Sequence, residues 1–583
     1  MNPAMTTLVP AGTVTFTVFS CSSVTYQSLL MKIRLGVLCI IGLFIHAGLM
    51  AQPAWSWAQQ AVSANTDYGR NMAKDVSGNV YVCGTFSATV TFGAVTLSGS
   101  GTNCMFLVKY DVAGNVVWAK TAIASGATYA NAVCVDPSGF VYVTGEFSTS
   151  IDFGGVLITG SPGDVFLVKY DAAGNPIWAQ RAGGTNAEQG YAVAADLFGN
   201  VFITGYYKSG VCTFGTFTLA NTNGSSSDLF IAKYDSSGTV LWAYRAGGNV
   251  YDMGNSITTD AAGSVYFTGF FASTNIVFGS FGLMNSGPSA TSDIFVAKYD
   301  STGNVRWAVS FGGASGDEEA FGITTDSGDH IYVTGTFSST SLQMGSTNLQ
   351  NTDGNIFIAK LDTAGVVNWA LNGGGTNGFL YRNSIASDSS GDVYVAGSFS
   401  NDTAFFSGDT LLNTDVTGAS RDFFVVKCNP AGQVDWTVTG GGTLSDDAYG
   451  VVAMGNDNFV TMGAFASAAM TIGTTTLNNS GLYDFFITNA GSSPLIVQDQ
   501  SNTGTTSIFP NPCSGWATLQ VDAALLLDKP VLNVYDMLGN LVLTSQLNSI
   551  ETQIDLSGLA PAVYSYTISG PHDTAAHGKL VRQ

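Results

Sequence analysis

The sequence predicts an all-β fold in which one four-stranded unit is repeated seven times, followed by a second, smaller β domain. Three observations predict it. Tryptophan recurs in one register at intervals of 60 to 67 residues. Almost the same phrase surrounds it each time, as in "KYDAAGNPIWAQRAGG" from Lys169 and "KYDSSGTVLWAYRAGG" from Lys233. The chain of 583 residues has 70 glycines and only 10% charged residues, which is typical of strands joined by tight turns.

The repeat is defined by four positions at nearly constant spacing. In six copies an Asp follows the Trp by 18 or 19 residues, a Gly follows that Asp by nine, and a Lys precedes the next Trp by nine. Insertions fall only between the Gly and the Lys, so this stretch should hold exposed loops while the remainder is packed framework. The repeated tryptophans are Trp57, Trp118, Trp178, Trp242, Trp307, Trp369 and Trp436.

Each copy reads as four strands. In one copy these are "YAVAAD", "VFITGYY", "DLFIAKYD" and "TVLWAYRA". Asp-x-x-Gly pairs between them suit tight turns, because Asp bonds nearby backbone N–H groups and Gly accepts positive φ. Strands such as "VFIT" are apolar at successive positions, which indicates burial on both faces. Seven such small sheets predict a seven-bladed β-propeller of four-stranded blades, with the tryptophans wedged between blades.

The two ends of the repeat region predict a closed ring. One Trp strand, around Trp57, precedes the first complete copy, and the last copy ends at Asp484–Gly491 without one. We therefore expect Ala54–Ala61 to pair with "DFFITN" and to complete the last blade, which would leave no exposed sheet edge.

The repeats resemble those of the SBBP family of secreted bacterial β-propellers. The resemblance is carried by "GGASGDEEAFGITTDSGDHIYVTGTF" and "DIFVAKYDSTGNVRWA" and covers about residues 54–490. It implies the fold but no activity, because the biochemical role of the family is largely undefined. The Asp-x-x-Gly-x-x-x-Trp phrase also resembles the Trp-docking motif of quinoprotein propellers, one residue shorter, and is interpreted as blade locking without a cofactor.

The C-terminal segment resembles a type A sorting domain of the type IX secretion system. Its alternating strands predict a small β-sandwich. The resemblance implies export, contact with the type IX secretion machinery, and delivery to the cell surface or the extracellular space. An unrelated adhesive β-sandwich is the alternative. The residues that match the sorting motif are Pro510, Asn511, Pro512, Gly539, Lys579 and Arg582.

Residues 31–51 read as a secretory signal peptide. Lys32 and Arg34 form its positive start, and an apolar run follows that is too short for a transmembrane span. We expect five segments, namely an upstream extension (1–30), the signal peptide (31–51), the propeller (52–490), a linker (491–505) and the sorting domain (506–583).

Charge and histidine content exclude several classes of function. The net charge of −21 disfavours nucleic acid and anionic lipid as partners. His330 is the one histidine of the propeller region and lies at a turn, which excludes Ser–His–Asp and Cys–His sites there. The sequence also lacks an HExxH motif and a phosphate-binding glycine loop.

Carboxylates remain as candidates for a site. Five copies carry one ten residues after the Trp, while Thr128 and Phe379 interrupt the series. Equivalent positions should crowd one end of the propeller, which would suit Ca²⁺ or an amine, or a carboxylate pair for glycoside cleavage. The alternative is a set of solvated turn caps, and no copy has the Asp-x-Asp-x-Asp spacing of a calcium loop. The acids are Asp67, Glu188, Asp252, Asp317 and Asp446.

The sequence favours a binding protein over an enzyme. We expect an exported, monomeric, non-enzymatic scaffold without a cofactor, whose variable Gly-to-Lys loops contact a glycan or protein ligand. The rival is a carboxylate-dependent glycosidase or lyase in the central funnel, where Glu146 is one acid without counterparts in the other copies. The repeated Lys residues should pair with the repeated Asp residues, because an unpaired Lys between blades would be costly. A ring of these Lys residues for anionic ligands is the alternative.

Overall fold

The structure is a computed structural model, and its described residues form two compact units that divide after Ser492. The expected upstream extension and signal peptide lie outside the described residues. The first unit is described over 52–491, with gaps at 101–102, 222, 224–225, 289–290, 354, 376–382, 401 and 416–419. The second is described over 507–582, with gaps at 510–512, 514, 522–529, 537–540, 561 and 570–573.

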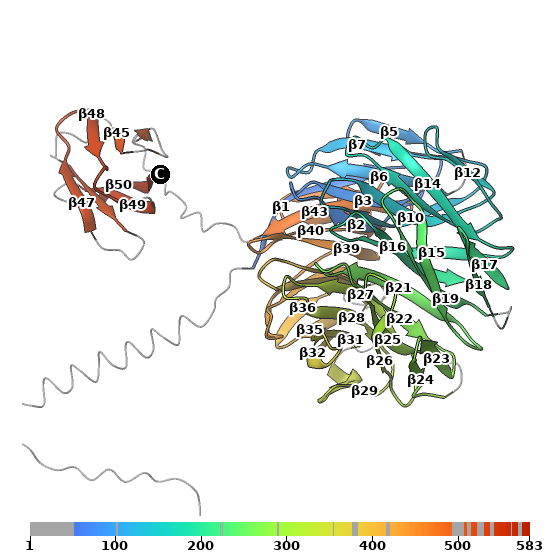
Figure 1. The fold of residues 1–583 in the computed structure, drawn as a ribbon. Coiled ribbons are helices and arrows are strands. Elements are labelled where there is room, and N and C mark those ends of the chain that lie inside the picture. The colour runs from blue at the N-terminus through green and yellow to red at the C-terminus, as the bar shows by residue number, and fades with distance from the viewer. Residues whose placement is uncertain are drawn as a thin grey trace, which may run out of the picture. The chain divides into compact units, whose positions relative to one another are not determined.

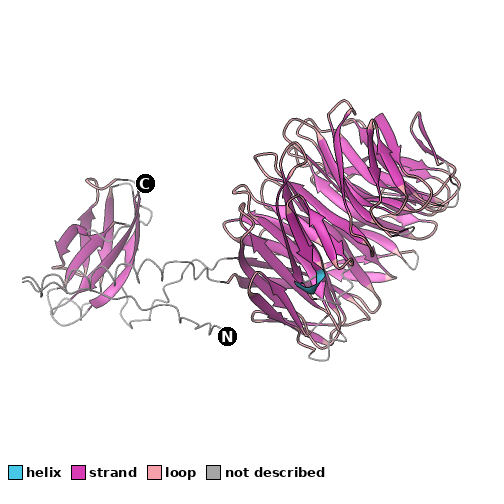
Figure 2. Cartoon of the chain, turned by 90° about the horizontal axis from the view of Figure 1, so that it is seen from below, coloured by secondary structure: helices cyan, strands magenta, loops and turns pink. Residues whose placement is uncertain are grey.

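Both units are all-β (Figure 2). In the parts that the structure describes, the helical content is a single 3-10 turn, η1 (Asn351–Asp353). No described helix therefore has the length and apolarity needed to cross a bilayer.

In its described residues the first unit contains seven antiparallel sheets that share the same frame of four strands, besides four smaller sheets of two or three strands (Figure 1). The first strands are β2 (Asp67–Lys74), β9 (Thr128–Val135), β15 (Glu188–Ala195), β21 (Asp252–Thr259), β27 (Glu318–Thr325), β33 (Ser384–Ser387) and β39 (Asp446–Gly455). The second strands are β3 (Val80–Phe86), β10 (Val141–Phe147), β16 (Val201–Tyr207), β22 (Val265–Phe271), β28 (Ile331–Phe337), β34 (Val393–Phe399) and β40 (Asn458–Phe465). The third strands are β6 (Cys104–Tyr110), β13 (Asp164–Tyr170), β19 (Asp228–Tyr234), β25 (Asp293–Tyr299), β31 (Ile356–Leu361), β37 (Asp422–Cys428) and β43 (Asp484–Gly491). The fourth strands are β7 (Val116–Thr121), β14 (Pro176–Gly183), β20 (Val240–Ala246), β26 (Val305–Phe311), β32 (Val367–Gly374), β38 (Val434–Gly440) and β1 (Ala54–Val62).

The fourth strand of the last frame comes from the start of the unit. β1 pairs with β43, so that Trp57 lies opposite Asn489 and Ala58 opposite Thr488. The hydroxyl of Thr488 also donates to the carbonyl of Trp57 at 2.8 Å. The pairing expected between Ala54–Ala61 and "DFFITN" is thus present.

Neighbouring frames pack face to face through hydrophobic clusters. The second strand β3 is buried along its whole length, as strands covered on both faces should be. Each first strand contacts the next in the order β2, β9, β15, β21, β27, β33 and β39, and β39 contacts β2. One cluster joins Met462, Phe485 and Ile487 of the last frame to Val82 and Phe106 of the first.

Between the second and third strands, each copy extends a two-stranded arm. Three arms pair with the fourth strand of the preceding frame, as β4 does with β1 at Ala61 opposite Phe92. The sequence placed variable loops here but did not show that they extend a neighbouring sheet. The arms are β4 (Thr89–Phe92) with β5 (Val95–Ser98), β11 (Ser150–Asp152) with β12 (Leu157–Thr159), β17 (Val211–Phe214) with β18 (Phe217–Ala220), β23 (Asn275–Phe278) with β24 (Phe281–Met284), β29 (Ser341–Met344) with β30 (Thr347–Gln350), β35 (Thr403–Phe406) with β36 (Asp409–Leu412), and β41 (Ala469–Ile472) with β42 (Thr475–Asn478). A short strand, β8 (Ile123–Ala124), pairs with β11.

The second unit has two antiparallel sheets that share one core. Leu519 and Ile554 of the first sheet meet Leu532, Tyr566 and Leu580 of the second. The sheets are β44 (Ser507–Phe509), β45 (Trp516–Gln520) and β48 (Glu551–Asp555), and β47 (Leu541–Gln546), β46 (Val531–Tyr535), β49 (Ala562–Ser569) and β50 (Thr574–Arg582).

Candidate functional site

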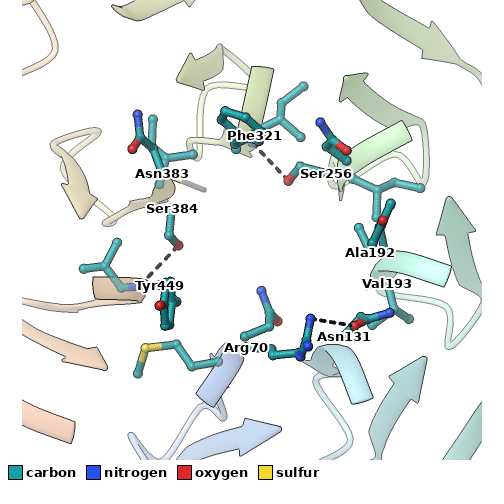
Figure 3. Close-up of a pocket in the computed structure, with 18 of the residues that line it drawn as sticks. Arg70, Asn131, Ala192, Val193, Ser256, Phe321, Asn383, Ser384 and Tyr449 are labelled. Carbon is teal, nitrogen blue, oxygen red and sulfur yellow. Dashed lines mark hydrogen bonds between the residues drawn. The ribbon is translucent and has the colours of Figure 1, made fainter. Parts of the chain in front are cut away.

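A pocket of about 420 Å³, here called the central pocket, is lined by residues from all seven copies (Figure 3). Its lining includes one set of residues, the polar ring, that holds one side chain from each copy. The polar ring consists of Arg70, Asn131, Tyr191, Asn255, Phe321, Asn383 and Tyr449.

A β-bulge in the first strand positions the polar-ring residue. In β2 the register passes from Gly69 directly to Asn71, so that Arg70 has no partner on β3. The same slip occurs in β9, β15, β21, β27 and β39. Gly84 makes it possible, because a Cβ there would lie 1.9 Å from the carbonyl oxygen of Tyr68. The repeated Gly of the sequence is thus needed for the bulge, which turns one side chain of each of these six copies toward the central pocket.

Asparagine and aromatic residues alternate around the polar ring, and Arg70 takes the seventh place. The amides of Asn131 and Asn255 are fixed, because each donates to a carbonyl of the following first strand at 3.0 Å. Arg70 donates to the amide oxygen of Asn131 at 3.5 Å and lies 5.4 Å from the ring centroid of Tyr129. The polar ring therefore presents preorganised side chains that differ from copy to copy.

Next to the polar ring the wall of the central pocket becomes apolar. Two residues beyond the polar ring, each copy supplies an aliphatic side chain to the pocket. The central pocket is thus amphipathic, which suits a ligand with both polar and apolar faces. The aliphatic residues are Met72, Val133, Val193, Ile257, Ile323, Ile385 and Val451.

Glu319 brings a carboxylate into the central pocket. Burial, together with the smaller effect of the nearby charge of Asp317, raises the pKa of Glu319 to about 7. Glu146, the other unmatched acid, does not line the pocket. Its pKa is also raised by burial, and a hydrogen bond from Gln189 and the charge of Arg70 oppose the rise.

The acids predicted from the sequence lie elsewhere. Four of them begin their first strands, are fully buried, and do not line the central pocket. Glu188, for example, accepts the backbone N–H groups of Gly184 and Ser209, both at 3.1 Å. They are therefore buried carboxylates at the start of the first strands, where they bond to the backbone of nearby segments. They are neither solvated turn caps nor a cluster in the central pocket. These four are Asp67, Glu188, Asp252 and Asp446.

For the fifth predicted acid, the structure places Glu318 at the equivalent position, and the predicted Asp317 lies one residue before it. Glu318 pairs with Phe337 in the position that Asp252 takes opposite Phe271, and Glu318 is fully buried. The link after Trp307 is one residue longer than in the preceding copy, so a fixed count of ten falls one residue short. Asp317 is exposed and accepts the backbone N–H of Ser292 at 3.0 Å.

A second set of buried acids, missed in the sequence, faces the first set. Each begins the third strand of the preceding frame, and its negative charge raises the pKa of its partner, as Asp484 does for Asp67. Where the first acid is replaced by Thr128, the second position holds Cys104, so both members of the pair are lost together. The pairs are Asp484 with Asp67, Asp164 with Glu188, Asp228 with Asp252, Asp293 with Glu318, and Asp422 with Asp446.

Metal binding by the acids stays a prediction. Among the residues that the structure describes, no group of three or more His, Cys, Asp or Glu side chains is placed to hold a metal ion. His330 contacts the turn residue Asp326 at 3.0 Å and does not line the central pocket.

The repeated tryptophans lie on the fourth strands and do not line the central pocket. Trp242 and Trp436 are buried, and the other five are half-buried. Four donate their indole N–H to a turn carbonyl of the next frame, as Trp307 does to Thr363 at 3.0 Å. The indoles therefore connect neighbouring sheets.

Of the predicted sorting-motif residues, Pro510, Asn511, Pro512 and Gly539 lie outside the described residues. Lys579 and Arg582 belong to β50. Arg582 donates to the carbonyl oxygen of Ser557 at 3.1 Å.

Sequence inspection missed the polar ring because its members differ between copies. Aligning the copies on the buried acid would have placed Arg70, Tyr191 and Asn255 at one position, three residues after it. That position holds arginine, asparagine, tyrosine or phenylalanine, whereas the position two residues further is aliphatic in every copy, and this contrast was the available signal.

Two families match parts of the chain. Residues 507–582 match the secretion system C-terminal sorting domain, and residues 177–206 match the β-propeller repeat, which confirms both resemblances. The sorting domain indicates export through the type IX secretion machinery to the cell surface or the extracellular space.

Two proteins of similar sequence and one of similar structure match the chain at low identity. An uncharacterized WD repeat-containing protein, L264, of Acanthamoeba polyphaga mimivirus is 26% identical over 78% of this chain and 38% of its own length. The regulatory protein FlaEY of Caulobacter vibrioides is 30% identical over 28% of this chain and 17% of its own length. The chain thus spans less than two fifths of either relative. A puromycin hydrolase structure covers 78% of this chain and 58% of its own, at 10% identity and a TM-score of 0.34.

Proposed function

We propose that this chain is a surface-displayed, monomeric binding protein in which the seven frames are the blades of one closed β-propeller. The cyclic order of contacts among the first strands supports closure, as does the pairing of β1 with β43. The core shared by the last and first frames supports it too.

The ligand is held in the central pocket. The observation that carries this proposal is the polar ring, in which one fixed position of the repeat bears side chains of different chemistry that converge on one cavity. A merely structural position would repeat its residue, as the Trp and Gly positions do. Amide, guanidinium and aromatic groups around an apolar wall suit a saccharide or a peptide segment.

The proposal is tested by screening the full chain against arrays of glycans and peptides. Phe321→Ala removes an aromatic side chain from the polar ring, and we expect it to weaken binding about tenfold or more. Phe405→Ala is the control, because Phe405 lies on an arm and is 49% exposed. Loss of binding in Phe405→Ala but not in Phe321→Ala would move the contact surface to the variable arms and contradict the proposal.

A carboxylate-dependent glycosidase or lyase is the second candidate. It is favoured by the raised pKa of Glu319, about 7, next to the second carboxylate of Asp317. Incubation of the full chain with any glycan that binds, followed by mass spectrometry, would show cleavage. Cleavage that is lost in Glu319→Gln would establish the enzyme and overturn the non-enzymatic role.

A further inference from the structure

Glu319 stands apart from the other acids near the polar ring. Asp447, which takes on β39 the position that Glu319 takes on β27, is held by the guanidinium of Arg421 at 2.6 and 2.8 Å. Among the described residues, the carboxylate of Glu319 makes neither a hydrogen bond nor an ion pair, although it is half-buried in the central pocket. An unpaired, half-buried carboxylate is stabilised when a ligand supplies a cation.

The surroundings of Glu319 suit an organic cation. Phe321 of β27 also lines the pocket, as do Met253 of β21 and Phe270 of β22, and both of these strands contact β27. The faces of aromatic rings attract ammonium groups, and their apolar surface strengthens the attraction to a nearby carboxylate.

Arg70 lies across the pocket from Phe321, which follows Glu319 by two residues on β27 (Figure 3), and its guanidinium is held by Asn131 and Tyr129. The ionisable groups that share the pocket with Glu319 are therefore Arg70, Tyr191 and Tyr449, with Asp317 beside it on the approach to β27.

We infer that the central pocket binds a primary ammonium group, with the carboxylate of Glu319 as its counter-ion and the rings of Phe270 and Phe321 beside it. This inference rests on the proposed function and specifies its ligand. Amino sugars and lysine side chains both carry this group. The net charge of −21 favours the approach of either cation.

Calorimetric titration of the full chain separates these sources. Glucosamine and Nα-acetyl-lysine amide are compared with N-acetylglucosamine and the diacetylated lysine amide, which lack the charge. We expect at least one amine to bind, and its acetylated form to bind about tenfold more weakly or not at all. Whichever amine binds more tightly identifies the source.

Glu319→Gln tests the counter-ion. It keeps the size of the side chain and should weaken amine binding about tenfold or more, while Glu551→Gln, an exposed position in the sorting domain, should leave binding unchanged. Circular dichroism checks that both variants are folded. Affinity for the lysine amide should rise between pH 6 and pH 8 as Glu319 loses its proton, and this rise should disappear in Glu319→Gln.

Three results would overturn the inference, namely no amine binding, equal binding of acetylated and free amines, or unchanged affinity in Glu319→Gln. Neutral glycans that bind and depend on Phe321 but not on Glu319 would remove the ammonium inference alone. An absence of any ligand that depends on Phe321 would remove the proposed function as well.

Discussion

At the scale of the residue, the turn between the third and fourth strands touches the tryptophan of the preceding frame. Gly114 has a φ of 82°, and a Cβ on it would lie 2.7 Å from the ring of Trp57. The same contact joins Gly432 to Trp369 at 2.7 Å. The glycine of the Asp-x-x-Gly turn thus serves twice, since it adopts positive φ and leaves room for an indole.

Gly114→Ala should destabilise the chain more than Gly139→Ala. Gly139 has nearly the same φ, 83°, but a Cβ there would meet nothing within 4 Å. Positive φ alone should cost about 1–2 kcal/mol at either site, and the Trp57 contact should add about 1–3 kcal/mol at Gly114 only. Urea denaturation measures both, and equal losses of stability would contradict the contact.

Individual residues were predictable from the sequence where the repeat holds them constant. The lysines illustrate this, because Lys298 and Lys360 lie 3.4 and 3.8 Å from the repeated acids Asp260 and Asp326. Asp317 was assigned to the wrong position because the link between Trp307 and the next strand holds one extra residue. The acid that begins this strand is therefore eleven residues after the Trp, and not ten. Asp164 and its equivalents were missed because the partner of a buried charge lies in the adjacent copy, which a single repeat does not show.

At the scale of the element, β1 joins the two ends of a 440-residue region through one strand pairing. β1 forms a ladder with β43. In addition, the side chain of Gln60 donates to the backbone carbonyl of Asn478 at 2.8 Å and accepts the backbone N–H of Asn478 at 2.9 Å. Ala61 and Trp57 contribute to the core between the last and first frames. β1 therefore adds both hydrogen bonds and buried area at the place where the chain has no covalent continuity.

Deletion of Ala54–Val62 should lower the thermal midpoint of the first unit by about 5 °C or more, since β43 loses its partner. The unpaired edge of β43 should also make the protein associate at higher concentration. Differential scanning calorimetry and analytical ultracentrifugation measure these effects. Deletion of 493–583 is the control, and it should leave this midpoint in place because those residues form the other compact unit.

At the scale of the whole molecule, the buried acid pairs make folding depend on pH. Burial and the facing acid raise the pKa of Asp67 to about 8 and those of Asp252 and Asp446 to about 6, from 3.8. At a pH between the ordinary pKa of 3.8 and these raised pKa values, the folded chain binds more protons than the unfolded chain. The free energy of unfolding should therefore decrease as the pH rises from about 4 to about 8.

The thermal midpoint should be higher at pH 5 than at pH 8, which scanning calorimetry measures. Asp67→Asn, which is neutral at both values, should reduce the difference and raise the midpoint at pH 8. A midpoint that rises with pH, or an unchanged slope in Asp67→Asn, would show that the acid pairs are ionised in the folded chain.

The overall architecture was predictable because it follows from repetition. Seven tryptophans at even spacing predicted seven similar sheets. The extra strand around Trp57 was expected to pair with the last copy, because that copy has no Trp strand of its own. The central pocket was not predictable in the same way. It depends on a backbone bulge in the first strand whose required glycine lies on the second strand, and on seven side chains that approach one another only when all the frames are assembled.

The bulge also separates two kinds of position within each repeat. Trp307 and Gly365 hold frames together, whereas Phe321 faces the cavity and touches neither of them. If the pocket binds a ligand as proposed, a mutation that exchanges Phe321 for another residue would alter molecular recognition and leave the scaffold intact. After duplication of the repeat, mutation of this single codon in each copy would change the specificity with few substitutions.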